Sequence, residues 1–457
     1  MLFSSIPFLF YFLPCVLILY AVSPKKLKNP TLLICSLVFY AWGEPRLVGL
    51  MLITVFLGYV LGLLTEKYRK YKKLFLTLSV VLSLGFLGYY KYVDFFIENI
   101  NAVTGLSITL LNVALPIGIS FYTFQLLSYN IDVYRGTVPA QKSFVNLATY
   151  ISLFPQLIAG PIVRYSDIEK QLHERTHTLE KTAVGVRRFV IGLSKKILLA
   201  NTLGEICEIF KGSDDKSVIY FWLYAVAFSL HVYFDFSGYS DMAIGLGKLF
   251  GFDFVENFNY PYISKSITEF WRRWHISLGS WFRDYVYIPL GGSRVGRVRM
   301  LINILVVWML TGFWHGAEWN FILWGLYFAV LLVVEKVLLL KWLNSSKIIS
   351  RIYVLFFVVI SFVIFNAVSL SEAIDYIGGM LGLGNYPLIS AEAVFYIKDY
   401  LFVLVLGLIG ATPIPKRLAL KLKATQWLEP IALVALLAIS TAYLVDGSFN
   451  PFLYFRF

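Results

Sequence analysis

The two histidines with the most promising surroundings, His315 and His275, lie forty positions apart in apolar and aromatic sequence. His315 stands in a glycine-bounded turn, residues 311–320, with nearly charge-free sequence on both sides. Desolvation disfavours a charged imidazolium, so a histidine buried there would be neutral and able to accept a proton at pH 7. Ionisable groups inside a membrane are rare and usually functional. His315 is therefore our first candidate for a catalytic base, and the alternative is a structural histidine bonded to a backbone carbonyl.

The turn around His315 supplies further candidates. Three side chains would contact a substrate or acyl donor held there: Trp314, Glu318 and Asn320. Glu318 would either orient His315 or pair elsewhere. Gly312 and Gly316 flank His315, and residues without a Cβ would let a substrate chain approach the backbone closely.

His275 lies in an aromatic and arginine-rich block, residues 270–292. Its ring could bind or orient the acyl group, or relay the proton. The alternative is an interfacial histidine among tryptophans, which are common at headgroup depth. Guanidinium groups bind phosphates with two hydrogen bonds, so the arginines would suit a donor such as a coenzyme A thioester. The alternative for most of them is lipid-headgroup contact.

The candidate donor-binding residues of this block are Trp271, Arg272, Arg273, Trp274 and Arg283, and Arg294, Arg297 and Arg299 complete a predicted cytoplasmic arginine cluster. Gln156 joins them as a polar residue in the proline-interrupted segment Phe154–Pro161. We expect the donor, a coenzyme A thioester or another acyl thioester, to be a substrate, and we expect no tightly bound cofactor.

Other polar residues have plainer interpretations. Asp235 and Asp241 could be catalytic carboxylates, but we expect them to neutralise nearby arginines or to cap a helix. Asp284 should form a local ion pair with Arg283. His231 should be a packed core histidine. The remaining pair, His173 and His177, has the spacing of two metal ligands on a helix, but no third ligand is in register, so we expect no metal site.

Composition defines the class of protein that must position these residues. Hydrophobic residues make up 58% of the 457-residue chain and charged residues 15%, where a soluble domain carries about 25%. We therefore expect a polytopic membrane protein. The net charge of +13 lies mostly in short loops and helix ends, so it indicates orientation and lipid contact and not a nucleic-acid partner.

Hydropathy and the positive-inside rule predict an all-α fold of about 10–12 transmembrane helices in a single membrane-embedded domain, residues 1–457, with both termini outside. Leu301–Phe313 and Phe321–Val334 flank the His315 turn, and each is about 20 Å of helix, short of a bilayer core of about 30 Å. They predict a re-entrant hairpin with His315 at its tip. Further predicted elements are a span over Ile108–Leu127, an external amphipathic piece over Asp94–Gly105, a broken or re-entrant helix over Phe144–Ala159, an interfacial helix over Gly185–Ala200 and a span over Val218–Phe234.

Seven blocks together resemble the membrane-bound O-acyltransferase family, and within it the bacterial alginate O-acetyltransferase branch. They are Phe154–Pro161, Asp235–Asp241, Trp271–His275, Trp281–Tyr285, Ile288–Gly292, Trp314–Gly316 and Tyr454–Phe457. The resemblance implies re-entrant and interfacial helices with the spans around a central funnel. It also implies that His315 matches the family's active-site histidine and His275 its second histidine.

The activity implied by the resemblance is transfer of an acetyl group from a cytoplasmic thioester towards the outside. The group would pass to an extracytoplasmic acetyltransferase partner protein that completes O-acetylation of a polysaccharide. The location implied is the bacterial inner membrane, in contact with its lipids. Two alternatives stay open: a polysaccharide or lipid-linked sugar transporter, and a scaffold that recruits a soluble acetyltransferase, for which His315 would be dispensable.

Overall fold

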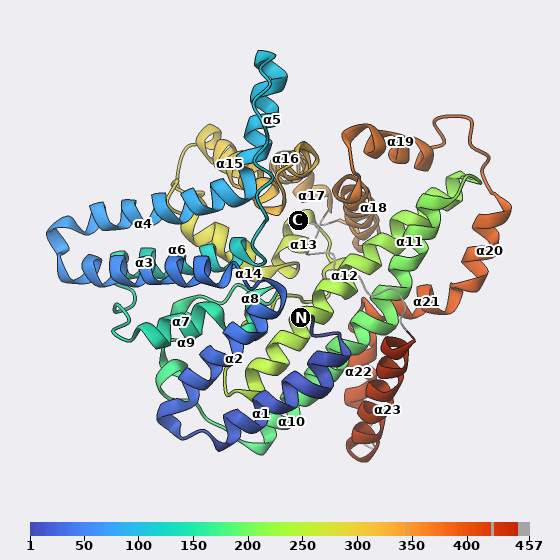
Figure 1. Ribbon diagram of the computed structural model, residues 1–457. Helices are drawn as coiled ribbons and strands as arrows, with labels where there is room; N and C mark the ends of the chain where they lie inside the picture. Colours follow the sequence, from blue (N-terminus) through green and yellow to red (C-terminus); the bar gives the residue numbers. More distant parts are fainter. Residues whose placement is uncertain (344, 422–424, 447–457) are drawn as a thin grey trace. The chain divides into compact units, whose positions relative to one another are not determined.

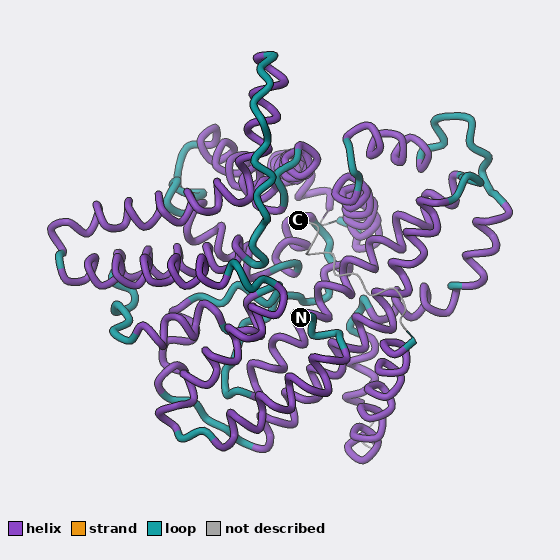
Figure 2. Tube along the Cα trace, in the orientation of Figure 1, coloured by secondary structure: helices purple, strands orange, loops and turns teal. Residues whose placement is uncertain are grey.

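The computed structural model of the protein describes residues 1–343, 345–421 and 425–446. All regular secondary structure in these ranges is helical (Figure 1, Figure 2). This confirms the all-α class. The motif Tyr454–Phe457 and the predicted position of the C-terminus lie outside the described residues.

Seven helices in the described ranges are long and apolar enough to cross a membrane, or eight if one bent pair counts as a single span. The seven are Val48–Lys67, Arg69–Thr104, Val218–Leu249, Arg297–His315, Trp319–Leu343, Lys347–Asn366 and Trp427–Val445. The bent pair, Ala391–Asp399 and Leu401–Gly410, changes direction by 61°. The protein is therefore a multi-pass membrane protein. The count is lower than predicted because several apolar segments form short helices, such as Phe8–Val22.

The described chain divides into two compact units, which we treat separately. Unit 1 comprises Met1–Phe189 and Ser240–Val255, and unit 2 comprises Val190–Tyr239 and the described residues from Glu256 onwards. The single domain and the ring of helices around a funnel stay predictions.

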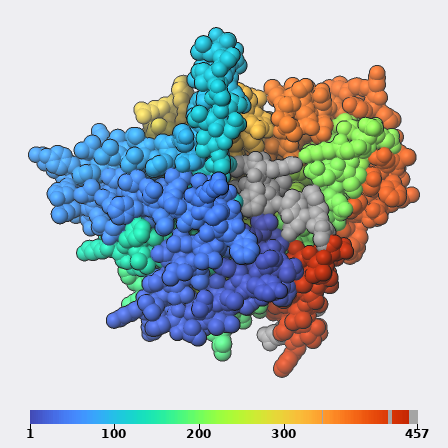
Figure 3. All heavy atoms as spheres, viewed as in Figure 1, coloured from blue at the N-terminus to red at the C-terminus, as the bar shows by residue number. Residues whose placement is uncertain are grey.

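Unit 1 contains the N-terminal helices. They are α1 (Leu13–Val22), α2 (Lys28–Gly43), α3 (Val48–Lys67), α4 (Lys72–Leu87), α5 (Val93–Thr104), α6 (Ile119–Arg135), α7 (Phe144–Ser152), α8 (Phe154–Leu157), α9 (Tyr165–His173) and most of α10 (Leu179–Ser194). Small residues bring α3 against α6, because a Cβ at Gly58 would lie 2.3 Å from a methyl carbon of Leu126. Such close approach is the usual basis of helix packing in lipid. Outward-facing residues of α4, including Leu74 and Val81, stay exposed, and Figure 3 shows this helix on the surface.

The predicted span over Ile108–Leu127 is wrong in its first half. Residues 105–118 form no helix, and α6 begins only at Ile119, after Pro116 and a left-handed Gly118. The non-helical segment returns along α5, which projects from the neighbouring helices of unit 1 (Figure 1). Two contacts fix it: the Leu111 N–H donates to Asp94 Oδ1 at 2.8 Å, and the Asn101 side chain bonds both backbone groups of Ile108. The predicted amphipathic piece Asp94–Gly105 is confirmed as α5.

The predicted break within Phe144–Ala159 is confirmed. Helix α7 ends at Ser152, Leu153 adopts an extended ψ of 110°, and α8 restarts at Phe154 with a proline in its first turn. Proline is tolerated there because the first-turn N–H groups have no helical acceptor.

Unit 2 contains the end of α10 and the later helices. They are α11 (Thr202–Gly212), the first part of α12 (Val218–Leu249), α13 (Ile267–Arg273), α14 (Ile276–Phe282), α15 (Arg297–His315), α16 (Trp319–Val334), α17 (Leu340–Leu343), α18 (Lys347–Asn366), α19 (Leu370–Met380), α20 (Ala391–Asp399), α21 (Leu401–Gly410), α22 (Ile414–Lys421) and α23 (Thr425–Val445). The predicted span Val218–Phe234 is confirmed. It is the first part of a helix of 32 residues, which continues through both aspartates of the Asp235–Asp241 motif. The predicted interfacial helix corresponds to the end of α10 and the π-helical turn Lys195–Asn201.

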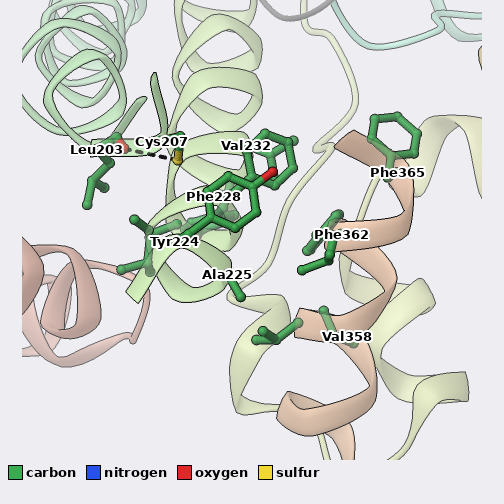
Figure 4. Packing of buried hydrophobic residues seen from close by; sticks show 14 of the residues in the cluster. Leu203, Cys207, Tyr224, Ala225, Phe228, Val232, Val358, Phe362 and Phe365 are labelled. Carbon is green, nitrogen blue, oxygen red and sulfur yellow. Dashed lines mark hydrogen bonds between the residues drawn. The ribbon is translucent and has the colours of Figure 1, made fainter. Parts of the chain in front are cut away.

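The core of unit 2 lies between α11, α12 and α18 (Figure 4). Tyr224 and Phe228 of α12 point towards the neighbouring helices, and Phe362 of α18 is buried in the same core. The Tyr224 ring stacks on Phe210 at 4.6 Å. Packing of this kind, and not exclusion from water, holds helices together in a bilayer. It fixes α18 beside the elements that carry the two candidate histidines.

Candidate active site

The predicted hairpin around His315 is present. Helix α15 ends at His315, residues 316–318 form the turn, and α16 begins at Trp319. The helices of the hairpin are longer than predicted, 19 residues before the turn and 25 after it, which is about 28 and 37 Å. The expectation that both are too short to cross a bilayer is therefore wrong. Charged ends such as Arg297 and Lys336 continue the helices that the hydropathy pattern alone would end.

The two glycines beside His315 have a different role from the predicted one. A Cβ at Gly312 would lie 2.2 Å from the Phe321 carbonyl oxygen, and one at Gly316 would lie 2.2 Å from the Phe321 ring. Across the hairpin, a Cβ at Gly325 would lie 2.3 Å from the Trp308 carbonyl oxygen. The space is filled by the hairpin itself, so the expectation that these glycines admit a substrate chain is wrong. They allow α15 and α16 to pack closely and thereby fix the position of His315.

His315 is enclosed by aromatic rings. Its imidazole meets Trp314 at 5.0 Å, Trp324 at 5.1 Å and Phe365 at 5.4 Å between ring centres, each nearly edge to face. These neighbours come from α15, α16 and α18, and only 9% of His315 is exposed. Such a wall excludes water from the imidazole without supplying a charge.

His275 is more deeply buried, at 2% exposure, and occupies the N-cap of α14. Its backbone is left-handed, with φ of 44°, which is unusual for a residue other than glycine. Its ring lies 4.7 Å from Phe236 and 6.1 Å from Trp314. Since Trp314 also contacts His315, the two histidines predicted from the sequence are brought to the same tryptophan.

Asn257 sets the tautomer of His275. The amide oxygen of Asn257 lies 3.2 Å from His275 Nδ1 and accepts from the backbone N–H and hydroxyl of Ser277, at 3.2 and 2.9 Å. A backbone N–H can only donate, so the oxygen of the amide, and not its nitrogen, faces this group. His275 Nδ1 therefore carries the proton, and Nε2 carries the lone pair. Asn257 was missed from the sequence, where it is one asparagine in an aromatic loop.

Electrostatics keep His275 neutral. Burial lowers the pKa of His275 well below its ordinary value, and the positive charge that His315 could carry lowers it further, against a smaller opposite effect of a backbone hydrogen bond. The two imidazoles are therefore close enough to affect each other's protonation. A neutral imidazole whose Nδ1 carries the proton can accept a hydrogen bond or a proton at Nε2.

Two tryptophans, Trp271 of α13 and Trp274 directly after this helix, line the site. Trp271 meets Trp324 at 5.6 Å and Trp308 at 4.6 Å, while Trp274 packs against Phe362 at 5.2 Å. The indole N–H groups of Trp271 and Trp324 are buried and have no hydrogen-bond partner among the described residues. They are donors available to a bound oxygen.

A buried carboxylate positions α13. Glu335, in the turn that follows α16, accepts hydrogen bonds from the backbone N–H groups of Ile267 and Thr268 and from the Thr268 hydroxyl at 2.9 Å. The first N–H groups of a helix lack partners within the helix, so this acid caps α13. It fixes the helix that leads to His275.

The other predicted site residues have partners or surroundings of their own. Arg273 pairs with Glu269 at 2.9 Å, and Arg272 is exposed. Arg283 pairs with Asp284 at 2.6 Å, which confirms the expected local ion pair. Asn320 donates to the Ala367 carbonyl at 3.0 Å and ties α16 to the end of α18, whereas Glu318 is exposed. Gln156 belongs to unit 1, where it is fully buried and bonds the Tyr150 carbonyl. The roles of these residues in binding a donor stay predictions.

The aspartates and remaining histidines follow the plainer interpretations. In unit 1, Asp241 pairs with Arg188 at 2.8 Å, as predicted. Asp235 pairs instead with a lysine, Lys196, at 2.6 Å in unit 2. His231 is confirmed as a core histidine, with its Nδ1 against the Ala200 carbonyl. No group of three or more metal-ligating side chains occurs in the described ranges.

Comparison with known families decides the class. The model of the membrane-bound O-acyltransferase family matches residues 137–371, which is more than half of the chain and includes both histidines. The chain belongs to the membrane-bound O-acyltransferase family. It is an O-acyltransferase, as the resemblance in its motifs predicted.

Three relatives of this O-acyltransferase are named for alginate, peptidoglycan and teichoic acid. A probable alginate O-acetylase of Azotobacter vinelandii is 38% identical, and the match covers the whole of both chains. A peptidoglycan O-acetyltransferase of Helicobacter pylori is 31% identical over the whole of this chain and 98% of its own. A teichoic acid D-alanyltransferase of Bacillus subtilis is 30% identical over 55% of this chain and 68% of its own.

Proposed function

We propose that this O-acyltransferase passes an acetyl group from a cytoplasmic thioester donor, such as acetyl-CoA, across the bacterial inner membrane for O-acetylation of an extracytoplasmic polysaccharide. The catalytic base is His315. An extracytoplasmic acetyltransferase partner protein receives the group and completes the transfer to the polymer. The names of the relatives support a polymer acceptor, because two of those named above are O-acetylating proteins that match the whole of this chain.

The observation that carries the proposal is the meeting of two buried imidazoles at one tryptophan, with His275 held neutral and its Nε2 unprotonated. A neutral imidazole in a site that excludes water is suited to general base catalysis. The family of the chain, the membrane-bound O-acyltransferases, supports the same reading. The site therefore favours acyl transfer over the transporter alternative.

The proposed reaction conserves protons. His315 takes the proton of an acceptor hydroxyl as the oxygen attacks the thioester carbonyl carbon. The carbon–sulfur bond then breaks, the imidazolium returns its proton to the departing thiolate, and the thiol leaves on the cytoplasmic side. His275 orients the reacting group through Nε2 or relays the proton. The unpartnered indole N–H groups of Trp271 and Trp324 are the donors we assign to the developing negative charge on the carbonyl oxygen.

The proposed donor site uses the arginines of the cytoplasmic face. Arg272 and Arg283 are exposed and would reach the phosphates of a coenzyme A donor. Membrane lipids would contact the apolar outer faces of the spanning helices, and the N-terminus would lie outside.

The test is the acetyl content of the secreted polymer in cells that carry His315→Ala. A positioned base contributes about 10²–10⁴-fold to the rate, so acetylation should fall to background while polymer export continues. The matched control is His173→Ala, an exposed histidine outside the site, which should acetylate normally. Both variants must be present in the membrane at wild-type amounts.

Two results would overturn the proposal. Normal acetylation by His315→Ala would leave a scaffold that recruits a separate acetyltransferase. Loss of polymer export, in place of its acetylation, would instead indicate a transporter.

A further inference from the structure

Three basic side chains of unit 1 gather around one buried tyrosine, Tyr20, near the end of α1. Lys28 Nζ lies 4.3 Å from the centre of the Tyr20 ring, and the guanidinium carbon of Arg175 lies 5.8 Å from it. His177 meets the same ring nearly edge to face at 5.6 Å, with its Nε2 3.3 Å from the Tyr20 hydroxyl. That hydroxyl donates to the Phe250 carbonyl at 2.8 Å. We call these four residues, Tyr20, Lys28, Arg175 and His177, the Tyr20 cluster.

The cluster is held by close packing. Arg175 stacks over the Phe252 ring at 4.4 Å. Beside it, Gly251 has a φ of 85°, and a Cβ there would lie 2.7 Å from His177 Cε1 and 3.1 Å from Arg175 Cβ. Both side chains are thus packed against backbone that only glycine accommodates. Cations positioned in this way are organised to bind a ligand.

The charged neighbours that shift the pKa values of Lys28 and His177 are all basic side chains. Burial lowers the pKa of Lys28, and the charges of Arg175 and Lys25 lower it further. Burial also lowers the pKa of His177, as do the charges of Lys28, Arg175 and Lys181. No carboxylate is among the groups that shift either pKa. The positive charges of Lys28 and Arg175 repel each other.

Asp253, two positions after Gly251 in the sequence, does not offset this repulsion. Asp253 already accepts hydrogen bonds from Lys181 at 2.7 Å and from Lys248 at 2.9 Å. At the same time Arg175 Nη1 is buried and has no hydrogen-bond partner among the described residues. A buried guanidinium nitrogen without an acceptor is costly, so the cluster has both the charge and the free donor that an anion would satisfy.

We propose that the Tyr20 cluster binds a phosphate group at the cytoplasmic face. Guanidinium and ammonium groups together are the usual protein ligands of phosphate. The positive-inside rule predicts that Lys25, Lys26 and Lys28, which follow α1, face the cytoplasm. Two sources offer the same chemistry: the phosphodiester headgroup of an anionic phospholipid and a soluble phosphate-bearing molecule. The Tyr20 cluster belongs to unit 1 and shares no residue with the proposed reaction, so it is tested independently of that reaction.

The experiment uses the purified full-length protein in a neutral detergent. Native mass spectrometry measures binding of phosphatidylglycerol and of phosphatidylcholine, and thermal unfolding is followed with each lipid and with inorganic phosphate. Arg175→Gln removes the charge and the unpartnered donor. Its matched control is Lys26→Gln, an exposed lysine of the same basic segment that is not in the cluster.

We expect Arg175→Gln to weaken binding of the phosphate ligand by at least about tenfold, as loss of a charge-assisted hydrogen bond predicts, and Lys26→Gln to weaken it less than about twofold. Without ligand, Arg175→Gln should be no less stable than wild type, because it relieves repulsion. Binding of phosphatidylglycerol in preference to phosphatidylcholine, with no effect of inorganic phosphate, identifies a lipid site. Stabilisation by inorganic phosphate identifies a site for a soluble molecule.

The proposal fails if neither phosphate source stabilises the wild-type protein, or if Arg175→Gln binds both as wild type does. Should Arg175→Gln not fold, His177→Gln at an exposed position carries the same test. His177→Gln should weaken binding of the same ligand, and unchanged binding would overturn the proposal.

Discussion

Two regions of unit 2 each bury a pair of ionisable side chains, but the two pairs differ in the charges that their members can carry. In one, which we call the buried ion pair, Lys196 and Asp235 lie 2.6 Å apart with side chains only 1% and 2% exposed. In the other, the histidine site, His275 and His315 lie against the same tryptophan. The ion pair joins opposite charges, whereas the histidine site brings together two groups that can only become positive.

The difference shows how a buried ionisable group can be classified. A charge that meets its opposite inside the protein is satisfied, and its cost of desolvation is offset by the partner. A base beside another base has no such partner: burial lowers the pKa of His275, and a positive charge on His315 would lower it further. Burial alone therefore does not identify a catalytic residue in a membrane protein, but the sign of the nearest ionisable group helps to do so.

Close helix packing builds the buried ion pair. A Cβ at Gly238 would lie 2.7 Å from the Gly192 carbonyl oxygen, so α10 and α12 touch backbone to backbone. This contact sets Lys196 and Asp235 face to face. Removing one side chain of the pair would leave the other charge without its opposite charge in a medium of low dielectric.

The largest effect on stability is expected from Asp235→Asn. Leaving Lys196 buried without its carboxylate should lower the free energy of unfolding by about 3–5 kcal/mol. The measurement is the midpoint of thermal unfolding in detergent. Asp241→Asn, in the same sequence motif, is the matched control, since the Arg188–Asp241 pair is partly exposed and should contribute no more than about 1 kcal/mol.

The double variant Lys196→Met with Asp235→Leu tests whether the unpaired charge is the cause of the lost stability. Replacing a buried pair by apolar side chains is often neutral, so the double variant should recover most of the lost stability. A double variant as unstable as Asp235→Asn alone would mean that the pair does not act through its charges.

The sequence predicted one of these regions better than the other. His315, its turn and its helical flanks could be recognised because a histidine bounded by glycine in apolar sequence is uncommon, and local pattern suffices to predict a hairpin. The buried ion pair could not be predicted, because Lys196 and Asp235 are distant in sequence and a lysine in a charged segment normally faces solvent. The expected partner of Asp235 was accordingly an arginine.

Asn257 and the two hairpin glycines show the same limit. Nothing in the sequence around Asn257 distinguishes it from other loop asparagines, and its importance comes from a fold that places its amide against His275 Nδ1. Gly312 and Gly316 were correctly singled out, but the sequence could not show that Phe321 fills the space beside them. Similarly, the apolar residues 106–117 satisfy a hydropathy pattern for a span, yet Pro116 and Gly118 delay the helix to Ile119.

A smaller effect on stability is expected from Gly312→Ala, which tests whether the histidine site depends on packing and not on charge. The added methyl would overlap the Phe321 carbonyl, and such overpacking typically costs about 1–3 kcal/mol. A displacement of His315 by about 1 Å could lower the acetyl transfer rate by up to about 10²-fold. The measurements are thermal unfolding and acetyl transfer by the purified protein.

Gly85→Ala is the control for this substitution. It lies in an apolar helix with open space around its Cα, so alanine there should be neutral or slightly stabilising. If Gly312→Ala were as active and as stable as Gly85→Ala, the hairpin could not be what positions His315.

The smallest but most specific effect is expected at Asn257. Asn257→Ala removes the acceptor that holds the His275 proton on Nδ1, and we expect the maximal rate of acetyl transfer to fall by about tenfold with little change in donor KM. An unchanged maximal rate would mean that the tautomer of His275 does not matter for the reaction.

Asn257→Asp would give the histidine site the property of the buried ion pair. A carboxylate against Nδ1 stabilises the imidazolium, so it should raise the pKa of His275 from its present lowered value. More of the enzyme would then carry a positive charge beside His315 at a given pH, and the acid limb of the rate profile should move to higher pH. A structural defect would lower the rate at every pH without moving the limb. A profile of wild-type shape in Asn257→Asp would therefore show that the neutral state of His275 does not control catalysis.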